Sequence, residues 1–374
     1  MINPKDLFEF LYKNHINFFS GVPDSLLKYF CAYLSDHCSE DQHIISANEG
    51  NAIGLAAGYY LGSKKPSMVY LQNSGIGNII NPILSLADKE VYRIPMLLLI
   101  GWRGEPSIKD EPQHVKQGKV TTQILDSIGV EWFIVGPETK DPIGVFTKAL
   151  KIMQLSETPI AVIVKKNTFE KYELLKKEKK DFSLLREEAL KIVLDNLSEN
   201  SLIVSTTGMT SREIFEYRES KGQPHFKDFL TVGSMGHTSS IALGLSLSQP
   251  NKKIICIDGD GSILMHLGAT AIQGVSERDN FFHILINNGA HDSVGGQPTV
   301  GKKINFCKIA NACGYKKIRK IAKPEEIKFS IDELINSEKG PVFLEIIVRK
   351  GSRNNLGRPT IKPIDNKKSF MDKL

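Results

Sequence analysis

The sequence predicts an α/β protein built from two parallel-sheet sandwich domains, and three observations support this class. Strand and helix signals alternate along the whole chain, which is typical of parallel sheets covered by helices. A charged segment without apolar periodicity, residues 167–182, separates two such alternating runs. The 374 residues are also enough for two separate cores. We therefore expect domains at 1–166 and 183–349, a linker between them, and a polar tail at 350–374.

In the first domain, the expected strands are short apolar runs, such as SMVYLQ and MLLLIG. The expected helices carry apolar residues at helical spacing. Taken along the chain, this assigns helix 4–14, strand 18–23, helix 24–35, strand 43–47, helix 49–61, strand 67–72, helix 78–88, and strands 96–101, 131–135 and 159–166.

The second domain continues the same alternation. The sequences of the two halves show no alignable internal repeat. Its clearest unit is IICI, then the helical pattern LMHLGATAIQGV, then FHILI. Such a strand–helix–strand crossover places its two strands parallel in one sheet. The expected strands lie at 202–205, 253–257, 282–286, 315–320 and 341–348.

Composition excludes several classes of protein. The chain is 41% hydrophobic and 24% charged, with a net charge of +6. It has no basic stripe interleaved with aromatic residues, which argues against nucleic acid as a partner. No apolar run reaches membrane-spanning length, and the N-terminus carries acidic residues where a signal peptide would not. The five cysteines show no CxxC pattern, so we expect reduced thiols in a cytoplasmic protein. The modest positive charge suits acidic substrates or an anionic cofactor.

The two strands of the clearest unit are each followed by polar residues. GDG (259–261) follows the first strand, and NN (287–288) ends the second. Asp260 and Asn288 should therefore meet at the carboxyl edge of the sheet, where ligands bind in open α/β folds. A carboxylate and an amide oxygen together suit a hard divalent cation that holds a phosphate. The alternative is an Asp that stabilises a turn beside a capped strand end.

A second notable stretch is SANEGNAIGLAAGYYLG (46–62), in which small residues dominate. Ser46 and Glu49 have the spacing of a capping box, which on its own is the better explanation of this glutamate. The other explanation is a carboxyl group held protonated by desolvation in a tight interface, where it donates a hydrogen bond to a cofactor ring.

Considered together, the glutamate and the GDG…NN pair resemble thiamine diphosphate-dependent enzymes. Within that superfamily, the chain is most similar to phosphonopyruvate decarboxylases, with sulfopyruvate decarboxylases as near relatives. The resemblance covers almost the whole chain and implies two domains of the thiamine diphosphate-binding type without a middle domain. The stretches that carry it are SGVPDSLLK (20–28), NEGNAIGLAAGYYLG (48–62), QNSGIGN (72–78), DEPQHVKQG (110–118), GSMGH (233–237), GDG (259–261), NNGAHDSVGGQPT (287–299) and GSRNNLGRPT (351–360).

The resemblance implies two cofactors, thiamine diphosphate and Mg²⁺. Asp260, the Asn288 side chain and the Ala290 carbonyl would hold Mg²⁺, and Glu49 would bond a ring nitrogen of the cofactor. Met235 matches the apolar residue that supports the bent cofactor, although a methionine at this position is equally well explained by core packing. The remaining cofactor-binding residues would be Gly233, Ser234, Gly259, Gly261 and Ser262.

The substrate side is less specific in the sequence. His114 and His291 lie in Gly-, Pro- and Asp-rich segments, and either suits a proton donor. Asp24 and Ser25 follow GVP at a helix start, where N-capping explains them as well as a catalytic or substrate-binding role does. The candidate cations for a phosphonate are Arg103, Lys109, Arg353 and Arg358, although solvated surface charge is the commoner role of such residues.

The implied reaction is decarboxylation of 3-phosphonopyruvate to phosphonoacetaldehyde and CO₂, a step in making 2-aminoethylphosphonate. The alternatives are a sulfopyruvate decarboxylase, an acetolactate synthase-like enzyme, and a cofactor-binding scaffold without activity. A dinucleotide-binding oxidoreductase is disfavoured because no GxGxxG follows a first strand. The small residues that follow Glu49 and the resemblance both predict a homodimer or a larger assembly of identical chains, with the cofactor between subunits.

Overall fold

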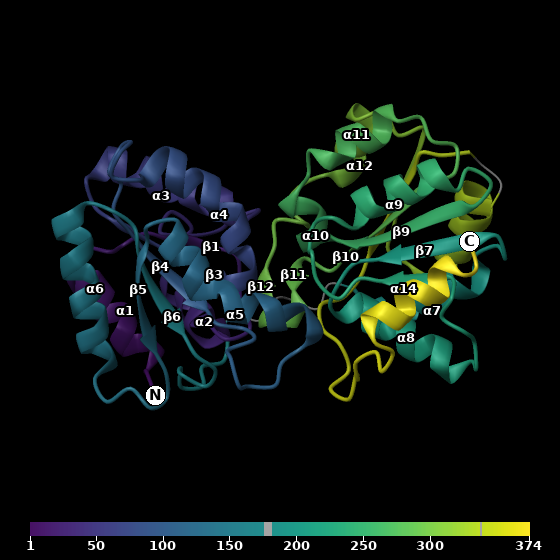
Figure 1. The fold of residues 1–374 in the computed structure, drawn as a ribbon. Helices are drawn as coiled ribbons and strands as arrows, with labels where there is room; N and C mark the ends of the chain where they lie inside the picture. Colours follow the sequence, from purple (N-terminus) through teal and green to yellow (C-terminus); the bar gives the residue numbers. More distant parts are fainter. Residues whose placement is uncertain (176–181, 337–338) are drawn as a thin grey trace. The chain divides into compact units, whose positions relative to one another are not determined.

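The computed structural model describes residues 1–175, 182–336 and 339–374. Contacts divide the chain into two compact units, Met1–Glu178 and Lys179–Leu374. Each unit contains one six-stranded sheet with helices on its faces, as Figure 1 shows for each unit in turn. This confirms the predicted α/β class with two parallel-sheet sandwich domains and no middle domain.

The first unit starts with a helix whose Asn3 cap accepts a hydrogen bond from the Lys5 amide. Proline follows the cap at the first helical position, where its missing N–H leaves no bond unmade. In chain order the unit comprises α1 (Pro4–Lys13), β1 (Phe19–Gly21), α2 (Lys28–His37), β2 (His43–Ile45), α3 (Glu49–Ser63), β3 (Ser67–Gln72), η1 (Asn73–Gly75), α4 (Ile76–Pro82), η2 (Ile83–Ala87), β4 (Met96–Gly101), α5 (Pro112–Ser127), β5 (Glu131–Val135), α6 (Pro142–Ser156) and β6 (Ile160–Val164).

The sheet of the first unit has the order β2-β1-β3-β4-β6-β5, and its neighbouring strands are all parallel. The chain moves from β1 to β2 on one side and then to β3 on the other side. The loops after β1 and β3 therefore diverge at the carboxyl edge, and such a switch point is where ligands bind in open α/β folds. One hydrophobic cluster packs α1, α2 and α6 against one face of the sheet, and a second packs α3, α4 and α5 against the other.

The second unit comprises, in chain order, α7 (Arg186–Asn196), β7 (Ser201–Ser205), α8 (Met209–Ser220), β8 (Asp228–Leu230), α9 (Thr238–Ser248), β9 (Lys253–Gly259), α10 (Asp260–Met265), α11 (Ala269–Val275), β10 (Phe281–Asn287), β11 (Ala290–His291), η3 (Asp292–Val294), β12 (Gln297–Pro298), α12 (Phe306–Ala312), β13 (Lys317–Ile321), α13 (Pro324–Ser330), η4 (Ile331–Asn336), β14 (Val342–Ile347) and α14 (Pro363–Met371).

The second sheet has the order β8-β7-β9-β10-β14-β13, again with all neighbours parallel. Counted from the first strand of each unit, both sheets follow the same order, 2-1-3-4-6-5. The two units therefore share one topology although their sequences show no alignable repeat. In the second unit, the switch in direction lies between β7 and β9, next to the GDG turn.

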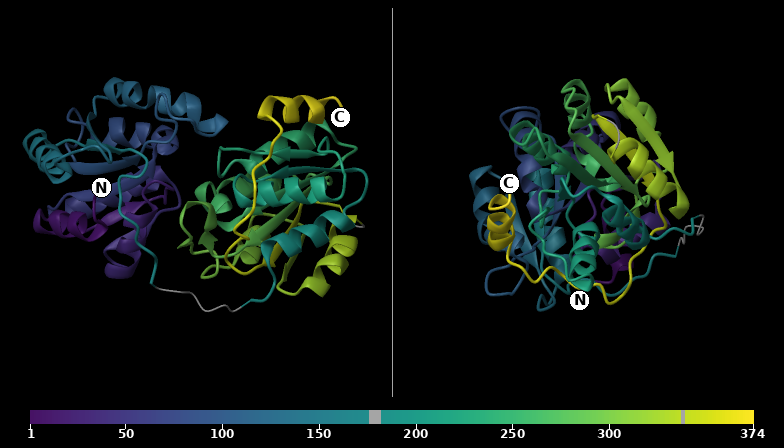
Figure 2. Two further views of the ribbon diagram at one scale, coloured as in Figure 1. Left: turned by 90° about the horizontal axis from the view of Figure 1, so that it is seen from below. Right: turned by 90° about the vertical axis from the view of Figure 1, so that its right-hand side faces the viewer.

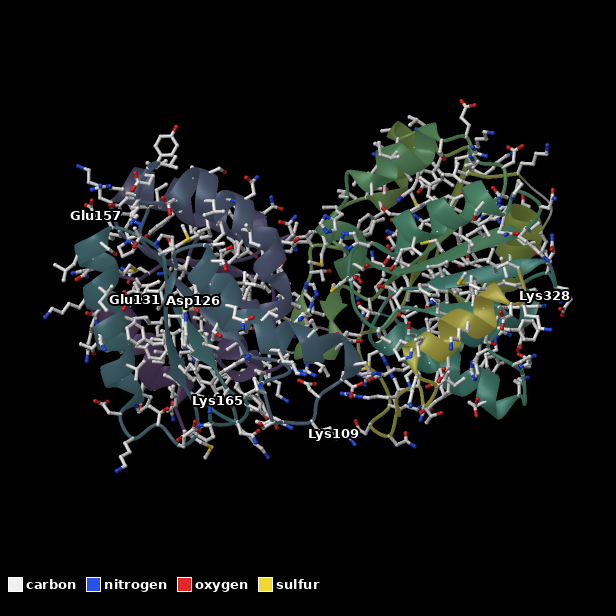
Figure 3. All side chains as sticks on the ribbon, viewed as in Figure 1. Lys109, Asp126, Glu131, Glu157, Lys165 and Lys328 are labelled. Atoms are coloured by element: carbon white, nitrogen blue, oxygen red, sulfur yellow. The ribbon has the colours of Figure 1, made fainter. Side chains whose placement is uncertain are left out.

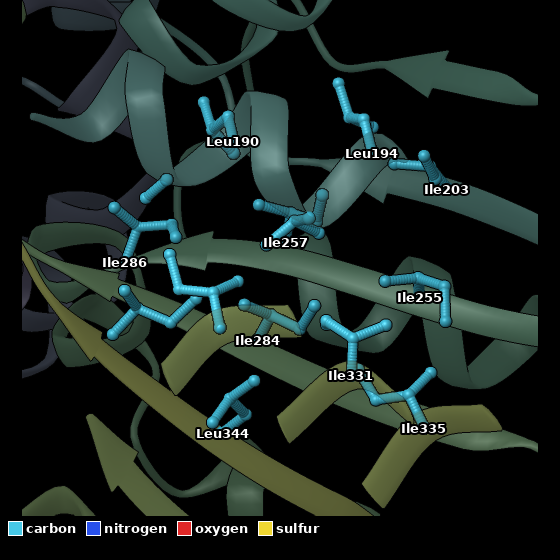
Figure 4. Packing of buried hydrophobic residues seen from close by; sticks show 14 of the residues in the cluster. Leu190, Leu194, Ile203, Ile255, Ile257, Ile284, Ile286, Ile331, Ile335 and Leu344 are labelled. Atoms are coloured by element: carbon cyan, nitrogen blue, oxygen red, sulfur yellow. The ribbon is translucent and has the colours of Figure 1, made fainter. Parts of the chain in front are cut away.

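Aliphatic residues that alternate along the central strands build the second core. Ile255 and Ile257 of β9 and Ile284 and Ile286 of β10 face α7 and η4, whose leucines and isoleucines interdigitate with them (Figure 4). The opposite face is covered by α9, α10, α12 and α14. Two fully packed faces explain why these strands are almost continuously apolar in sequence.

Two helices of the first unit were absent from the sequence-based assignment. α5 and α6 each begin with a proline at the first helical position. The Pro-, Gln- and Gly-containing start of α5 obscured its helical pattern in the sequence. His114 lies in this helix and not in a loop. The short strand β8 and the hairpin β11–β12 were also not predicted, because two or three residues carry no readable period.

The ends of the two units differ from the expected boundaries. Phe169 is buried in the first core and stacks on Phe30, and Tyr172 donates a hydrogen bond to Asp36. The first unit therefore continues past residue 166, and residues 176–181 of the expected linker lie outside the described residues. In the polar tail, α14 packs on the second unit (Figure 2): Phe370 is buried, and Asn366 donates to the Asp228 carbonyl.

Candidate active site

The predicted pair of polar residues meets at the carboxyl edge of the second sheet. β9 and β10 are parallel neighbours, and Asp260 and Asn288 directly follow them. The Asn288 backbone N–H donates to Oδ1 of Asp260 at 3.3 Å, and both residues are buried. The two residues are thus neighbours at this edge, and the role of the Asn288 side chain as a metal ligand stays a prediction.

The hairpin β11–β12 brings a third group to this edge. Thr299 follows the hairpin and donates its hydroxyl hydrogen to Oδ2 of Asp260. A side chain at Gly301 would come within 2.6 Å of the same carboxylate oxygen. Burial raises the pKa of Asp260 to about 6, although the bonds from Thr299 and Asn288 partly oppose that shift. A divalent cation would favour the charged form of this carboxyl group.

The backbone around Asp260 leaves room that a side chain would fill. A Cβ atom at Gly261 would lie 2.8 Å from the His291 ring and 3.3 Å from the Met235 methyl group. Met235 is only half-buried and belongs to none of the buried hydrophobic clusters of the described residues. It is flanked by Ser234 at φ +54 and Gly236 at φ +92. This turn projects the methionine beside the GDG turn, which favours the cofactor-supporting interpretation over plain core packing.

Two buried hydroxyl groups at the same edge were not found by sequence reasoning. Thr206 follows β7 and Thr238 opens α9, and each has an Oγ1 atom with no hydrogen-bond partner among the residues that the structure describes. A phosphate near the first turn of α9 would also meet unbonded amide groups and the positive end of the helix dipole. A diphosphate held through a divalent cation fits this edge of the sheet. The hydroxyl and amide donors would bond its oxygens, the buried carboxylate would hold the cation, and Gly259 and Gly261 have no side chains to block its approach.

His291 lies in β11, the first strand of the hairpin, next to Gly261. Burial lowers the pKa of His291 to about 4, while the nearby Asp292 partly opposes the shift. The imidazole is therefore neutral at neutral pH.

Glu49 is the first residue of α3 and is buried. The capping-box explanation is wrong: Asn48 caps the helix by accepting from the Asn51 amide at 2.9 Å, and Ser46 lies 2.6 Å from the Ser20 hydroxyl. Oε2 of Glu49 instead accepts a hydrogen bond of 2.6 Å from the Asn78 side chain. The carboxyl group thus does not stabilise its own helix start and is held beside α4.

The loops at the switch point of the first sheet bring Asp24, Ser25 and Arg103 together. Asp24 is fully buried and accepts from the Leu26 amide at 2.6 Å and from Gln72 Nε2 at 2.6 Å. The N-capping role expected for Asp24 is wrong, because α2 begins at Lys28 and its N-cap, Leu27, has no side-chain cap bond. Asp24 instead closes the turn before α2 and accepts a further bond from the end of β3. Burial raises the pKa of Asp24, against the opposing effect of its hydrogen bonds and of Arg103.

Arg103 follows β4 and contacts side chains of two different loops. Its Nη1 donates to Ser25 Oγ at 2.9 Å, and its Nε donates to Asp110 at 2.8 Å. Arg103 lowers the pKa of Asp110 even though burial opposes this shift. His114 is buried at the start of α5, and burial together with the Arg103 charge lowers its pKa. We did not predict Asp110, which balances the charge of Arg103.

The other predicted cations lie elsewhere. Lys109 is exposed on the loop before α5 (Figure 3). Arg353 forms ion pairs with Glu187, at 3.1 Å, and with Glu216, so its charge is offset within the second unit. Arg358 is exposed on the tail. Of the predicted cations, Arg103 therefore lies at the switch-point loops of the first unit, near the carboxyl groups of Asp24 and Asp110.

Comparison with known proteins agrees with this geometry. Residues 4–127 match the N-terminal, and residues 206–346 the C-terminal, TPP-binding domain of thiamine pyrophosphate enzymes. A phosphonopyruvate decarboxylase of Streptomyces viridochromogenes is 30% identical, and the alignment covers 99% of this chain and 94% of that protein. A sulfopyruvate decarboxylase of Methanosarcina acetivorans is 28% identical over 100% of this chain and 98% of that protein.

Relatives also occur as separate halves. The beta subunit of the sulfopyruvate decarboxylase of Methanococcus maripaludis is 33% identical over 51% of this chain, and its alpha subunit is 34% identical over 40%. Those alignments cover 98% and 86% of the two subunits, respectively. No helix in the described part of this chain is long and apolar enough to span a membrane.

The two domain matches and the near-full-length relatives show that the chain belongs to the thiamine pyrophosphate enzymes. It is a thiamine diphosphate-dependent decarboxylase of that family.

Proposed function

We propose that the protein decarboxylates 3-phosphonopyruvate to phosphonoacetaldehyde and CO₂ in the cytoplasm, as a step in making 2-aminoethylphosphonate. The observation that carries this proposal is the near-full-length similarity to two phosphonopyruvate decarboxylases, each 30% identical over 99–100% of this chain. The contact between Arg103 and Ser25 at the switch-point loops of the first unit supports a substrate that carries an anionic group.

In this proposal the second unit holds Mg²⁺ and the diphosphate. Asp260, the Asn288 side-chain oxygen and the Ala290 carbonyl are the proposed ligands of the ion. Gly259 and Gly261 let the backbone approach the diphosphate closely. Other proposed contacts come from residues of the two flanking turns and from the two unpartnered hydroxyl groups: Thr206, Gly233, Ser234, Met235, Thr238 and Ser262.

Glu49 is proposed to bond a ring nitrogen of the cofactor and to relay a proton there. Its burial and its hydrogen bond from Asn78 hold the carboxyl group in one place without tying it to its own helix start. Bound thiamine diphosphate supplies a thiazolium ring that accepts the electron pair released when CO₂ leaves. The protein must then deliver a proton to the carbon that lost the carboxylate.

We propose His114 for this proton delivery, assisted by Asp24. A pKa of about 4 leaves His291 neutral at neutral pH, so it serves better as a hydrogen-bonding neighbour of the cofactor than as an acid. His114 lies near Asp110, whose charge favours the imidazolium form, although burial and Arg103 act in the opposite direction.

Sulfopyruvate is the second candidate substrate, because the sulfopyruvate decarboxylase of Methanosarcina acetivorans also aligns over the full chain. The phosphonate and sulfonate groups differ in negative charge. The positive charge of Arg103, which would bind either group, is offset by the carboxylate of Asp110. CO₂ release from phosphonopyruvate, sulfopyruvate and pyruvate should be measured side by side, with the phosphorus product identified by NMR. We expect the highest kcat/KM for phosphonopyruvate. A higher value for sulfopyruvate would overturn the proposed substrate and leave the decarboxylase assignment intact.

The same assay on single variants tests the phosphonate-binding residues. Arg103→Lys retains the charge but loses the planar fork that contacts Asp110 and Ser25 together. We expect KM for phosphonopyruvate to rise selectively, with little change for pyruvate. Lys109→Gln, Arg353→Gln and Arg358→Gln serve as the comparison, and an unchanged preference in all four variants would place the cationic pocket elsewhere in the chain.

We further propose that the active unit is at least a homodimer, with the cofactor between subunits. The outer face of α3 carries Gly54, Gly58 and Gly62 one turn apart, and added Cβ atoms there would meet nothing within 4 Å. Leu55 and Leu61 of the same helix are 36% and 69% exposed. A small-residue helix face with exposed leucines suits close packing against a second copy.

A further inference from the structure

Arg186 is a buried cation that no motif in the sequence singled out. It is the first residue of α7 and is 5% exposed. The preceding residues are fixed to the end of the second sheet, because Leu185 forms a bridge with Arg349 and the Arg349 amide donates to the Leu184 carbonyl at 2.8 Å. This anchoring holds the start of α7, and with it the guanidinium group, in one position.

All three guanidinium nitrogens of Arg186 donate to carboxylates. Nε and Nη2 bond the two oxygens of Glu213 at 2.8 and 3.0 Å, and Nη1 bonds Asp292 Oδ2 at 2.8 Å. Glu213 is itself buried on α8. A bidentate pair with a third bond to another carboxylate uses the planar fork of arginine, which a lysine ammonium group does not reproduce.

Asp292 passes this constraint to the proposed metal site. Its Oδ2 atom accepts three hydrogen bonds: from Arg186, from the Asn288 side-chain amide at 2.8 Å and from the Gly351 backbone at 3.1 Å. The amide nitrogen of Asn288 is therefore directed to Asp292. The Oδ1 atom of Asn288 faces the other way, where it accepts a hydrogen bond from the Ala290 backbone N–H at 3.0 Å.

We propose that Arg186, acting through Asp292, is a positioning residue that sets which end of the Asn288 amide faces the Mg²⁺ site. This inference rests on the proposed role of Asn288 as a metal ligand. An amide that is free to turn would present NH₂ to the cation in a fraction of molecules, and NH₂ is not a ligand for Mg²⁺. Groups that orient metal ligands typically change metal affinity by about 10–100-fold when they are removed.

Two substitutions interrupt the chain of bonds at different points. Asp292→Ala removes the acceptor for the Asn288 amide and leaves the bidentate pair of Arg186 with Glu213 in place. Arg186→Lys keeps a positive charge but cannot hold Glu213 and Asp292 together. The matched control is Arg218→Lys, which disturbs a partly buried bidentate pair with Asp228 at 2.9 and 3.2 Å. That pair joins α8 to β8 and lies outside the Asn288 network.

The affinity for Mg²⁺ should be measured by isothermal titration at saturating thiamine diphosphate, after circular dichroism has shown that each variant is folded. We expect the Mg²⁺ Kd to rise about 10–100-fold in Asp292→Ala and Arg186→Lys and to stay within twofold of wild type in Arg218→Lys. If Arg186→Lys does not fold, Asp292→Ala decides the question alone.

Asp260→Asn separates this inference from the proposed metal site. Loss of Mg²⁺ affinity in Asp260→Asn together with an unchanged Kd in folded Asp292→Ala would overturn the positioning role and leave the site intact. Unchanged Mg²⁺ affinity in Asp260→Asn would instead overturn the proposed metal site. A weakening in Arg218→Lys equal to that in Asp292→Ala would show that general destabilisation, and not amide orientation, controls the affinity.

Discussion

Three carboxyl-bearing residues that follow the ends of strands are buried: Asp24, Glu49 and Asp260. Each accepts hydrogen bonds from neighbouring loops or helices, which offsets part of the cost of desolvation. Sequence reasoning singled out all three residues. Asp260 is a polar residue after an apolar strand, Glu49 begins a helix of small residues, and Asp24 follows GVP at an expected helix start. Their partners, such as Asn78 and Thr299, were not identified, since the folded chain brings them together from distant positions.

Asp24→Asn should separate stability from function. Burial raises the pKa of Asp24, so the stability contributed by its protonated form is fully present below its unfolded pKa and is lost as the pH rises through the folded value. The neutral amide avoids the cost of the buried charge. We expect a higher melting temperature than wild type at neutral pH, a smaller difference towards acid pH, and lower kcat. A lower melting temperature at neutral pH would show that the hydrogen bonds of the carboxylate outweigh its desolvation.

Mg²⁺ binding should depend on the ionisation of Asp260. The pKa of this carboxyl group is about 6 without a cation, so a proton competes with the metal below that pH. Mg²⁺ affinity should be nearly constant above about pH 6. Below that pH it should fall by about tenfold for each pH unit. Titrations at constant ionic strength across this range, with cofactor saturating, test the expectation. An affinity that stays constant through pH 6 would contradict the role of this carboxylate.

At the scale of elements, the turns and not the strands decide the local geometry of the site. Most strands could be predicted, because two packed faces demand apolar runs. Helix α5 could not, because its first turn carries Pro112, Gln113 and His114 in place of an apolar stripe. The hairpin that brings Thr299 to Asp260 has strands of two residues each, too short for any period to appear.

The turn at Ser234–Gly236 offers a test with a matched control. Gly236 has φ +92, and an added Cβ would come within 2.7 Å of the His266 ring and 2.8 Å of Met265. Gly222 also has positive φ, at +62, but an added Cβ would meet nothing within 4 Å. Gly222→Ala should therefore cost only the backbone strain, about 1–2 kcal/mol. Gly236→Ala should cost more and should also weaken thiamine diphosphate binding, because Met235 would be displaced.

Denaturant unfolding and cofactor titration of both alanine variants check this expectation. Cofactor affinity should stay at the wild-type value in Gly222→Ala. Equal cofactor affinity in Gly236→Ala and Gly222→Ala would mean that the turn does not position Met235 at the cofactor.

At the scale of the whole molecule, one sheet topology occurs twice. Both units have the strand order 2-1-3-4-6-5, and in both the candidate residues follow the carboxyl ends of strands. Alternation of strands and helices predicts parallel sheets but not the order of strands within them, so this repetition was invisible in the sequence. The repetition gives each unit an equivalent carboxyl edge. Glu49 and Arg103 follow strands of the first unit, and Asp260 and Asn288 follow strands of the second.

In the proposed dimer, the edges of two different chains serve one cofactor, with Glu49 from one subunit and Asp260 from another. A chain with Glu49→Gln retains Asp260, and a chain with Asp260→Ala retains Glu49. Each variant alone should be inactive. In a mixed dimer with shared sites, one site receives both substitutions and the other receives neither.

Subunit exchange between the two inactive variants therefore tests the claim most directly. Random reassociation makes half of the dimers mixed, and half of the sites in a mixed dimer are intact, so decarboxylase activity should return to about a quarter of the wild-type value. Exchange itself is verified with differently tagged chains. Activity that remains absent after verified exchange would place Glu49 and Asp260 of one chain at the same cofactor and would contradict the shared arrangement.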